Sequence, residues 1–320
     1  MNNGLKSFTK QINLSINDLV DTYVNINKAD ANFHIVVPLI KSIGLCPIDL
    51  KLIYNLRNHN SQTDFGKGFQ LNYYSHINGM ENCDVSVTNP DGSTDSYLVS
   101  ENYYNKDTKL TCKVTENDDT YFEFKDKIGN IFSYWSNYNE DYPTEFIYKT
   151  NDKISFDVSD SLIKISNNHQ DIMKLNKDNN GNVTLVSYYH NNVLLNSIEI
   201  NYDTNSYISK IIYKNGNTIT NSFSFSFSIN FIEIIDDITG RRFKFLIENS
   251  RVITIKEGFN VAYNYSQDIN ITYFNRYSVI TDYKGKKSYC FFDNNNLLDF
   301  EFNDDGILNR VKYNNDKLLI

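Results

Sequence analysis

A short unit that recurs along the chain constrains its fold more than any other feature. The unit reads Asp, two residues, Gly, a polar or basic residue and then an alternating run with an aromatic side chain; copies are residues 126–132, 237–243 and 282–289. Units of the form Tyr-Asp-turn-apolar lie between them, as in residues 200–211. Gly, Asn and Asp supply the positive φ that tight turns need, and alternation is typical of a half-buried strand. The repeat predicts an all-β fold of long antiparallel hairpins in one winding, elongated sheet.

Composition limits the partners that the chain can have. It has 320 residues, a net charge of −8 and a pI near 5.2, and Tyr (24 residues) and Phe (21) dominate its apolar set. The negative charge, together with the lack of any run of Lys or Arg, predicts no nucleic-acid partner. No apolar run approaches the ~18–20 residues that span a bilayer, so no membrane span is predicted. No secretory signal is expected either, which leaves a virion protein, or a protein that is cytoplasmic before release.

The organisation of the sequence changes twice. Residues 1–30 are expected to form an N-terminal arm, which either contains one short helix over residues 15–25 or is extended throughout. Residues 31–145 are interpreted as an irregular β region, and they contain all four prolines. Residues 146–320 contain no proline. Because a central strand must donate every N–H, this last part is interpreted as YD-type β-hairpin repeats in a continuous sheet.

Three short segments carry a resemblance to a known family. They are residues 54–55 (Tyr-Asn), 64–68 (Asp-Phe-Gly-Lys-Gly) and 71–72 (Leu-Asn). They resemble the N-terminal region of rearrangement-hotspot (RHS) proteins with tyrosine-aspartate (YD) repeats, although Leu56 stands where Ser is usual and Phe69 where Trp is usual. The resemblance implies a large winding β-sheet that curls into a hollow shell, in secreted, surface, toxin-delivery or phage-tail proteins, with sugar binding often proposed. The chain lacks the family's core-closing motif and toxin domain, so it looks like the sheet module used alone.

Five glycines are predicted to allow a particular backbone conformation rather than to bind a ligand. Gly129, Gly240 and Gly285 share a position after Asp-x-x, and we expect them at hairpin tips with positive φ. Gly66 and Gly68 lack the spacing of a phosphate-binding loop. They are interpreted as a sharp corner of a sheet where only glycine fits.

No cofactor or metal site is predicted. None of the five histidines pairs with another His or Cys at the spacing of metal ligands. Cys46, Cys83, Cys112 and Cys290 lack the short spacing of a zinc knuckle or a redox motif. They are expected to be free thiols, although their even number leaves disulfides open.

Acid pairs in the sequence leave glycoside hydrolysis open, and one aromatic segment leaves glycan binding open. Adjacent acids occur at residues 118–119, 140–141, 236–237 and 304–305, and glycoside hydrolysis needs two carboxylates about 5–10 Å apart. All four pairs lie in turn-like contexts, where the side chain of Asp usually hydrogen-bonds to nearby backbone groups.

The aromatic segment contains Tyr134, Trp135 and Tyr138. It fits either an exposed glycan platform or cross-strand packing.

Three functions remain after these arguments. The favoured one is a non-enzymatic structural module of a larger assembly, such as a phage tail, a virion appendage or an RHS-type delivery shell. The alternatives are a glycan-binding module for surface recognition and a glycoside hydrolase that uses paired Asp residues. The expected partners are other subunits or further copies of the chain, contacted through an open sheet edge or through residues 1–28; a cell-surface glycan is the alternative partner.

Overall fold

The computed structural model describes residues 11–17, 21–27, 32–44, 46–78, 84–88, 94–98, 104–105, 108–114, 120–125, 129–135, 142–259, 265–292, 298–304, 306 and 308–310. Within these ranges the chain forms antiparallel strands and one single-turn 3-10 helix, η1 (Leu56–Asn58). The prediction of an all-β fold built from antiparallel hairpins is confirmed.

Twenty strands form one sheet, called here the long sheet, in which each strand pairs with the next one in the sequence. From β15 onward, the turns that follow odd-numbered strands lie along one edge of this sheet (the odd-turn edge), and the others lie along the even-turn edge. The strands are β11 (Tyr104–Asn105), β12 (Thr108–Val114), β13 (Thr120–Lys125), β14 (Ile131–Trp135), β15 (Glu145–Ile147), β16 (Lys153–Val158), β17 (Leu162–Asn167), β18 (Asp171–Lys177), β19 (Val183–His190), β20 (Val193–Tyr202), β21 (Ile208–Asn215), β22 (Thr218–Ser228), β23 (Phe231–Asp236), β24 (Arg241–Glu248), β25 (Arg251–Phe259), β26 (Tyr265–Tyr273), β27 (Tyr277–Thr281), β28 (Lys287–Phe292), β29 (Leu298–Asn303) and β30 (Leu308–Arg310).

The earlier part of the chain forms three smaller sheets. A five-stranded sheet, called here the inner sheet, has the order β1-β2-β3-β4-β7; a second has the order β10-β9-β8; and β5 pairs with β6. Their strands are β1 (Gln11–Asn17), β2 (Thr22–Asn27), β3 (Phe33–Lys41), β4 (Asp49–Asn55), β5 (Gln62–Thr63), β6 (Gly66–Lys67), β7 (Phe69–Leu71), β8 (His76–Asn78), β9 (Asp84–Thr88) and β10 (Thr94–Leu98).

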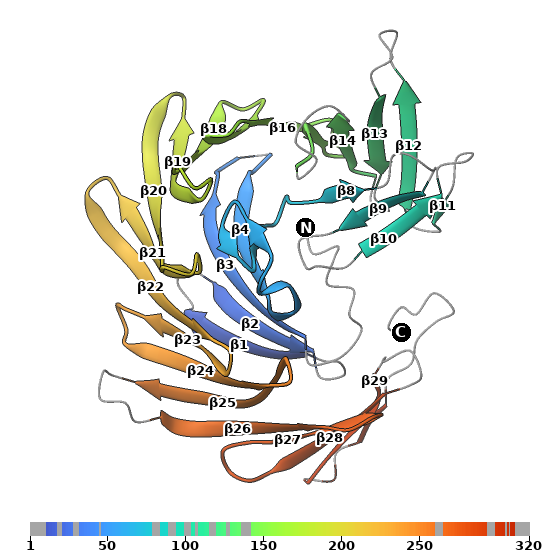
Figure 1. Cartoon of the computed structure of the whole chain (residues 1–320), viewed down its shortest axis with the longest axis vertical. Coiled ribbons are helices and arrows are strands. Elements are labelled where there is room, and N and C mark those ends of the chain that lie inside the picture. Colours follow the sequence, from blue (N-terminus) through green and yellow to red (C-terminus); the bar gives the residue numbers. More distant parts are fainter. Residues whose placement is uncertain are drawn as a thin grey trace.

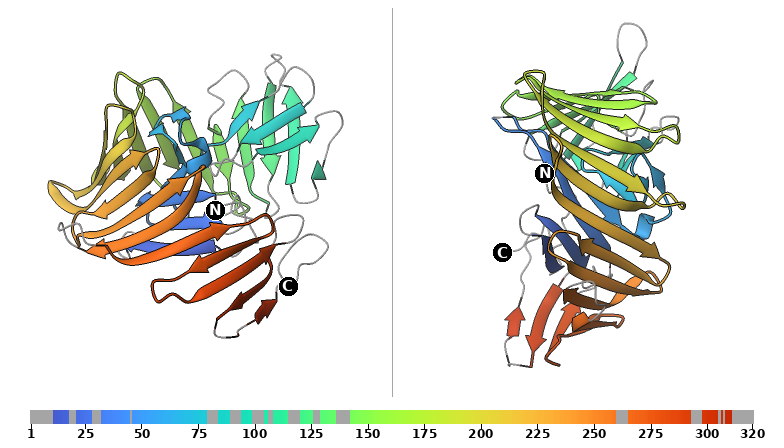
Figure 2. Two further views of the ribbon diagram at one scale, coloured as in Figure 1. Left: turned by 60° about the horizontal axis from the view of Figure 1, so that its bottom comes forward. Right: turned by 90° about the vertical axis from the view of Figure 1, so that its left-hand side faces the viewer.

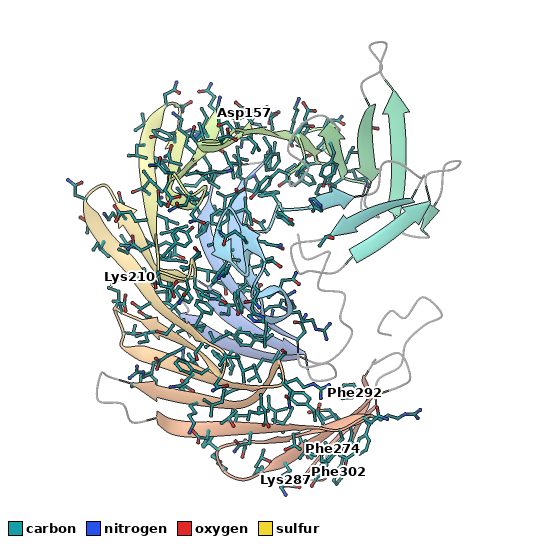
Figure 3. The ribbon with its side chains drawn as sticks, in the orientation of Figure 1. Asp157, Lys210, Phe274, Lys287, Phe292 and Phe302 are labelled. Atoms are coloured by element: carbon teal, nitrogen blue, oxygen red, sulfur yellow. The ribbon has the colours of Figure 1, made fainter. Side chains whose placement is uncertain are left out.

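The long sheet curves around the inner sheet, so that β1 to β4 lie inside its arc (Figure 1). Two further views show the same arrangement (Figure 2). Side chains fill the space between the two sheets, whereas Lys210 points outward from the long sheet (Figure 3). Buried apolar residues of both sheets form one continuous cluster. The inner sheet therefore occupies the hollow of the long sheet.

Strand alternation explains how the two sheets meet. In β22, Phe223 and Phe225 are buried while Ser226 between Phe225 and Phe227 is exposed. Phe227 lies 5.1 Å from the ring of Tyr54 in β4, measured between ring centroids. Aromatic pairs at such distances add to the free energy gained by burying their area. An alternating run in the long sheet thus supplies one wall of the core, and the inner sheet supplies the other.

Of the two alternatives for residues 15–25, the helix is wrong, and the described residues of the segment are extended. This segment lies in the hairpin of β1 and β2, whose turn includes Asp21 at φ 52°. The apolar residues of this segment are accommodated by strands instead, because Ile16 in β1 and Val24 and Ile26 in β2 are buried against the core. Branched side chains favour strands, and a paired strand can bury them against the long sheet while satisfying its backbone.

The proposed divisions after residues 30 and 145 stay predictions. The ladder of the long sheet runs through the second of them, because β15 pairs with β14 on one side and with β16 on the other.

A five-residue turn recurs in the long sheet at residues 178–182, 203–207 and 282–286. In each, the first Asp accepts hydrogen bonds at Oδ1 from the N–H groups two and four residues later. The fourth residue has positive φ, at 82°, 67° and 82° respectively. The repeat seen in the sequence therefore encodes this turn through one capping carboxylate and one left-handed residue.

The unit at residues 237–243 turns differently, although its sequence matches the one at 282–289. The N–H of Gly240 donates to the carbonyl of Asp236, and the Asp236 carboxylate accepts from the N–H groups two and three residues later. The turn-forming aspartate is thus one residue earlier than the repeat suggests. Gly129 and Gly240 have positive φ, at 98° and 72°.

Candidate functional site

A buried carboxylate, Asp171, joins the long sheet to the loop between β3 and β4. Only 1% of this residue is exposed. Its Oδ1 lies 2.9 Å from the hydroxyl of Tyr188 and 2.8 Å from Nδ1 of His190, and its Oδ2 accepts from Nδ2 of Asn167 at 2.9 Å. The hydroxyl of Ser42, in the β3–β4 loop, also hydrogen-bonds this carboxylate. We call these five residues the Asp171 cluster.

Strand register places the members of the Asp171 cluster together. Asp171 opposes His190 across the β18–β19 pair, and Asn167 stands at the end of β17, just before the turn that leads to Asp171. The Asn167 side chain also donates to the carbonyl of Cys46 at 2.7 Å. The Asp171 cluster therefore ties two hairpin ends of the long sheet to one loop of the inner sheet.

Two opposing effects set the pKa of Asp171. Burial acts to raise the pKa of this carboxyl, but hydrogen bonds from His190, Asn167, Tyr188 and Ser42 outweigh burial and hold the pKa below its usual value. The carboxyl is therefore ionised at neutral pH, with its charge met by donors from both sheets.

A second Asp–His pair lies on the same edge of the long sheet. Nε2 of His169 lies 3.1 Å from Oδ1 of Asp152, and Thr150 donates to the other carboxylate oxygen at 2.8 Å. Burial, with the charges of Asp152 and Asp171, raises the pKa of the Cys46 thiol to about 11. A protonated, buried thiol is a poor nucleophile at neutral pH.

The order of contacts around Asp171 is not that of a nucleophile activated by a base. In such a site the imidazole lies between the hydroxyl and the carboxylate. Here the carboxylate lies between Ser42 and His190, since both hydrogen-bond to Asp171. Ser42 also accepts from the N–H of Ile48 at 2.8 Å. This geometry suits a structural clamp.

A second clamp holds the inner part of the chain to the even-turn edge. Nζ of Lys177, whose side chain is 5% exposed, lies 2.9 Å from Oδ1 of Asp64. The N–H of Val183 donates to the Asp64 carbonyl at 2.7 Å, and the N–H of Lys67 donates to the Ser206 carbonyl at 2.8 Å. Both edges of the long sheet are therefore bonded to the part of the chain that fills its hollow.

Close approaches beside the second clamp explain two of the predicted structural glycines. A Cβ on Gly66 would lie 2.3 Å from the carbonyl oxygen of Ser206, and one on Gly68 would lie 2.6 Å from Cε2 of Tyr54. Both glycines also have positive φ, a conformation that other residues rarely adopt. Gly66 is thus required by packing against the long sheet, and Gly68 by packing against Tyr54 of the inner sheet.

The carboxylates of the described acid pairs form hydrogen bonds and ion pairs with nearby backbone and side-chain groups. Asp236 is buried and accepts from Asn17. Its neighbour Asp237 accepts from the hydroxyl of Ser222 at 2.7 Å and pairs with Lys210 at 3.1 Å. The pairs at 118–119 and 140–141, and Asp305 of the fourth pair, lie outside the described residues.

The predicted glycan platform is described only in part. Tyr134 is buried, and its hydroxyl donates to Ser75 at 2.7 Å, so its ring packs inside the protein. Trp135 is the last residue of β14, but its side chain lies outside the described part, as does all of Tyr138. Glycan binding through Trp135 and Tyr138 stays a prediction.

The described residues contain few other groups that could carry chemistry. No set of three or more His, Cys, Asp or Glu side chains among them is placed to hold a metal ion. Cys46 and Cys290 are both buried, and Cys46 is a free thiol; Cys83 and the side chain of Cys112 are not described. Within the described part of the chain, no helix has the length and apolar character needed to cross a bilayer.

Comparisons with known proteins do not assign a family. No family profile and no curated protein matches the sequence. Among solved structures, the chain is similar to the C-terminal WD40 domain of Sif2, at 8% identity and a TM-score of 0.20, covering 72% of this chain and 79% of that one. It is also similar to BamB from Moraxella catarrhalis, at 9% identity and a TM-score of 0.13, covering 87% and 83%. Scores this low carry no argument about fold or function.

The resemblance to RHS and YD-repeat proteins is corrected by these comparisons. No family profile supports the motif match, and the two solved structures named above are not RHS or YD-repeat proteins. The residues at 64–68 that carried the resemblance have a local explanation in the packing of Gly66 and Gly68.

Proposed function

We propose that the chain is a non-enzymatic structural β-repeat module that contacts other subunits of a larger protein assembly. The assembly would be a phage tail or a virion appendage, in which β-rich subunits are joined by protein contacts. The module would contribute a fixed shape and exposed edges rather than a reaction.

One observation carries the proposal: the part of the chain inside the arc is bonded to both edges of the long sheet, through the β3–β4 loop of the inner sheet at one edge and the β5–β6 turn at the other. Asn167, which donates to Asp171, also donates to the Cys46 carbonyl of the β3–β4 loop at the odd-turn edge, and Asp64 is held at the even-turn edge by Lys177 and Val183. Buried polar groups of this kind are costly unless they are fully paired. Their pairing across the two sheets fixes the curvature of the long sheet, which is what a scaffold needs.

The proposal is tested by the native mass of the chain in its own cells. The chain should be isolated under mild conditions with an affinity tag, and its complexes weighed by native mass spectrometry. We expect a species heavier than the 37.3 kDa chain that contains at least one other polypeptide in a fixed ratio. Recovery of the chain only as a free monomer, or turnover of a substrate that depends on His190 or Asp237, would contradict it.

A further inference from the structure

Exposed apolar side chains gather along the odd-turn edge of the long sheet. Among the described residues, only Ile229 and Phe274 of the exposed large apolar side chains lie at the even-turn edge. Six of the others lie on three successive hairpins, β19–β20, β21–β22 and β23–β24 (Figure 1), and on the β3–β4 loop, whose backbone at Ile43 hydrogen-bonds the hydroxyl of Tyr188 in β19. We call these six residues the rim patch: Ile43, Val193, Leu194, Leu195, Ile219 and Ile238. Apolar groups that gather in this way on a folded protein mark an interaction surface.

Two members of the rim patch occupy the same position in successive hairpins. Leu194 is the second residue of β20 and precedes a β-bulge at Leu195, and Ile219 is the second residue of β22 and precedes a β-bulge at Thr220. The two side chains are 51% and 53% exposed. Because hairpins in one sheet repeat every two strands, these projections recur about 10 Å apart. Bulges protect a sheet edge from strand pairing, so the rim patch offers a partner its side chains rather than its backbone.

Most of the sequence that carries the rim patch is uncharged. Residues 42–48, 191–198 and 215–223 contain no Lys, Arg, Asp or Glu. The whole chain has a net charge of −8, so two copies repel each other over much of their surfaces. In a contact between identical surfaces related by a two-fold axis, a charge near the axis meets the same charge on the partner, which is costly. Uncharged segments avoid this repulsion.

Charged side chains that border the rim patch are paired within the chain. Lys214, which opposes Ile219, forms an ion pair with Glu199. In the next turn along the edge, Asp237 pairs with Lys210 at 3.1 Å. These two pairs bring no net charge to the border of the rim patch, so a second copy can approach it without placing their charges against like charges.

We propose that the rim patch is a contact between two copies of the chain, related by a two-fold axis, in which the apolar projections of one copy fit the gaps between those of the other. The spacing selects a second copy as the occupant, because an identical edge has the same repeat of about 10 Å, whereas an unrelated partner would have to match it by chance. This inference goes beyond the proposed function, since such a dimer can form with or without other subunits.

The extent of the rim patch is comparable with that of a dimer interface. The hairpins from β19 to β24 are consecutive in the long sheet, and their strands, about 4.8 Å apart, extend over roughly 24 Å. The β3–β4 loop widens the surface with Ile43, which is 80% exposed. A round patch of about 800 Å², the area that each partner of a stable dimer buries, is roughly 30 Å across. The rim patch with its flanking residues can therefore supply such an interface.

The test measures self-association of the full chain by sedimentation velocity over a range of protein concentrations. The wild type should form a dimer of twice the 37.3 kDa chain mass. Added NaCl should not weaken this dimer, because the contact is apolar and salt screens the repulsion between the copies. Leu194→Thr/Ile219→Thr keeps residues that favour strands and should weaken dimerisation at least about tenfold. Ile229→Thr is the matched control, since Ile229 is 87% exposed at the even-turn edge, and it should dimerise like the wild type.

A pair of charged variants identifies the occupant as a second copy. Leu194→Glu/Ile219→Glu and Leu194→Lys/Ile219→Lys should each be monomeric, because like charges meet across the two-fold axis. When the two variants are mixed, they should form a heterodimer, whichever of the two positions face each other. Thermal unfolding of each variant checks that it is folded.

Three results would overturn the inference. They are a wild type that stays monomeric, equal dimerisation by Leu194→Thr/Ile219→Thr, or charged variants that do not associate when mixed. A monomeric wild type that binds phosphatidylcholine vesicles, and loses this binding in the Thr variant, would make a lipid surface the occupant instead. The native complex in cells separates this failure from that of the proposed function. A dimer without any other polypeptide leaves this inference standing while the proposed function fails, and a monomer that joins other polypeptides leaves the proposed function standing without this contact.

Discussion

Nδ2 of Asn17 donates a hydrogen bond of 2.6 Å to Oδ2 of Asp236, across 219 residues of sequence. The contact joins β1, the outermost strand of the inner sheet, to the turn between β23 and β24. Asp236 also caps that turn through two N–H groups. One carboxylate therefore shapes a hairpin and holds the inner sheet against it.

Replacing Asp236 should destabilise the whole chain. Asp236→Ala removes the turn cap and leaves the buried side chain of Asn17 without this bond, which should lower the free energy of unfolding by about 1–3 kcal/mol. Urea unfolding followed by tryptophan fluorescence measures the change. Asp160→Ala is the control at an exposed turn, and it should change stability by less than about 0.5 kcal/mol. Equal effects of the two substitutions would show that the contact with Asn17 is not stabilising.

The corner glycine Gly66 should tolerate a methyl group much less well than a free turn glycine. Gly66→Ala adds a Cβ 2.3 Å from the Ser206 carbonyl oxygen, so overpacking should add about 1–3 kcal/mol to the cost of positive φ. Gly181→Ala is the matched control, because Gly181 has φ +82° and no atom within 4 Å of its built Cβ. That control should lose about 1 kcal/mol. Chemical unfolding of both variants would reveal the difference, and similar losses would mean that Ser206 moves freely.

The Asp171 cluster should make stability sensitive to acid. The pKa of Asp171 is lower in the folded chain than its ordinary value, so the unfolded state binds a proton more readily. The stabilisation is therefore fully present above pH ~4, and it is lost as the pH falls through the lowered pKa. Urea midpoints between neutral pH and about pH 3 should fall more steeply for the wild type than for Asp171→Asn. Parallel curves would contradict the role given to this carboxylate.

The buried thiols should resist labelling in the native state. Cys46 and Cys290 are buried, and burial is the main cause that raises the pKa of Cys46 to about 11. Iodoacetamide near pH 8 should therefore modify both slowly in buffer and rapidly in urea. Peptide mapping by mass spectrometry reads each cysteine separately. Rapid native labelling of Cys46 would show that the β3–β4 loop opens.

Local patterns in the sequence predict the strands and most turns of the long sheet. The turn at 282–286 follows directly from its Asp and Gly, because both act within five residues. The hairpin at residues 237–243 shows the limit of this reasoning. The motif places the aspartate at 237, but Asp236 forms the turn, since only Asp236 is oriented toward both the turn and Asn17.

The clamps between the sheets could not be predicted because their partners are distant in the sequence. Nothing near Ser42 indicates that it will meet Asp171, and β1 was open to a helical interpretation because its core partners lie beyond residue 200. The exposed start of β20 did leave a signal. Three apolar residues directly after Asn191-Asn192 interrupt the alternation, and this break marks a surface that the fold itself does not cover.

The enclosure of the inner sheet by the long sheet has a consequence for synthesis of the chain. Strands β1 to β4 leave the ribosome before the strands that cover them, because their core partners extend to Phe243 and Phe245 in β24. Pairings so remote are slow to form, and apolar surface that waits for them is prone to aggregate. A ribosome-bound chain that ends before β24 should therefore recruit chaperones, and release from them should follow the emergence of β24 and β25.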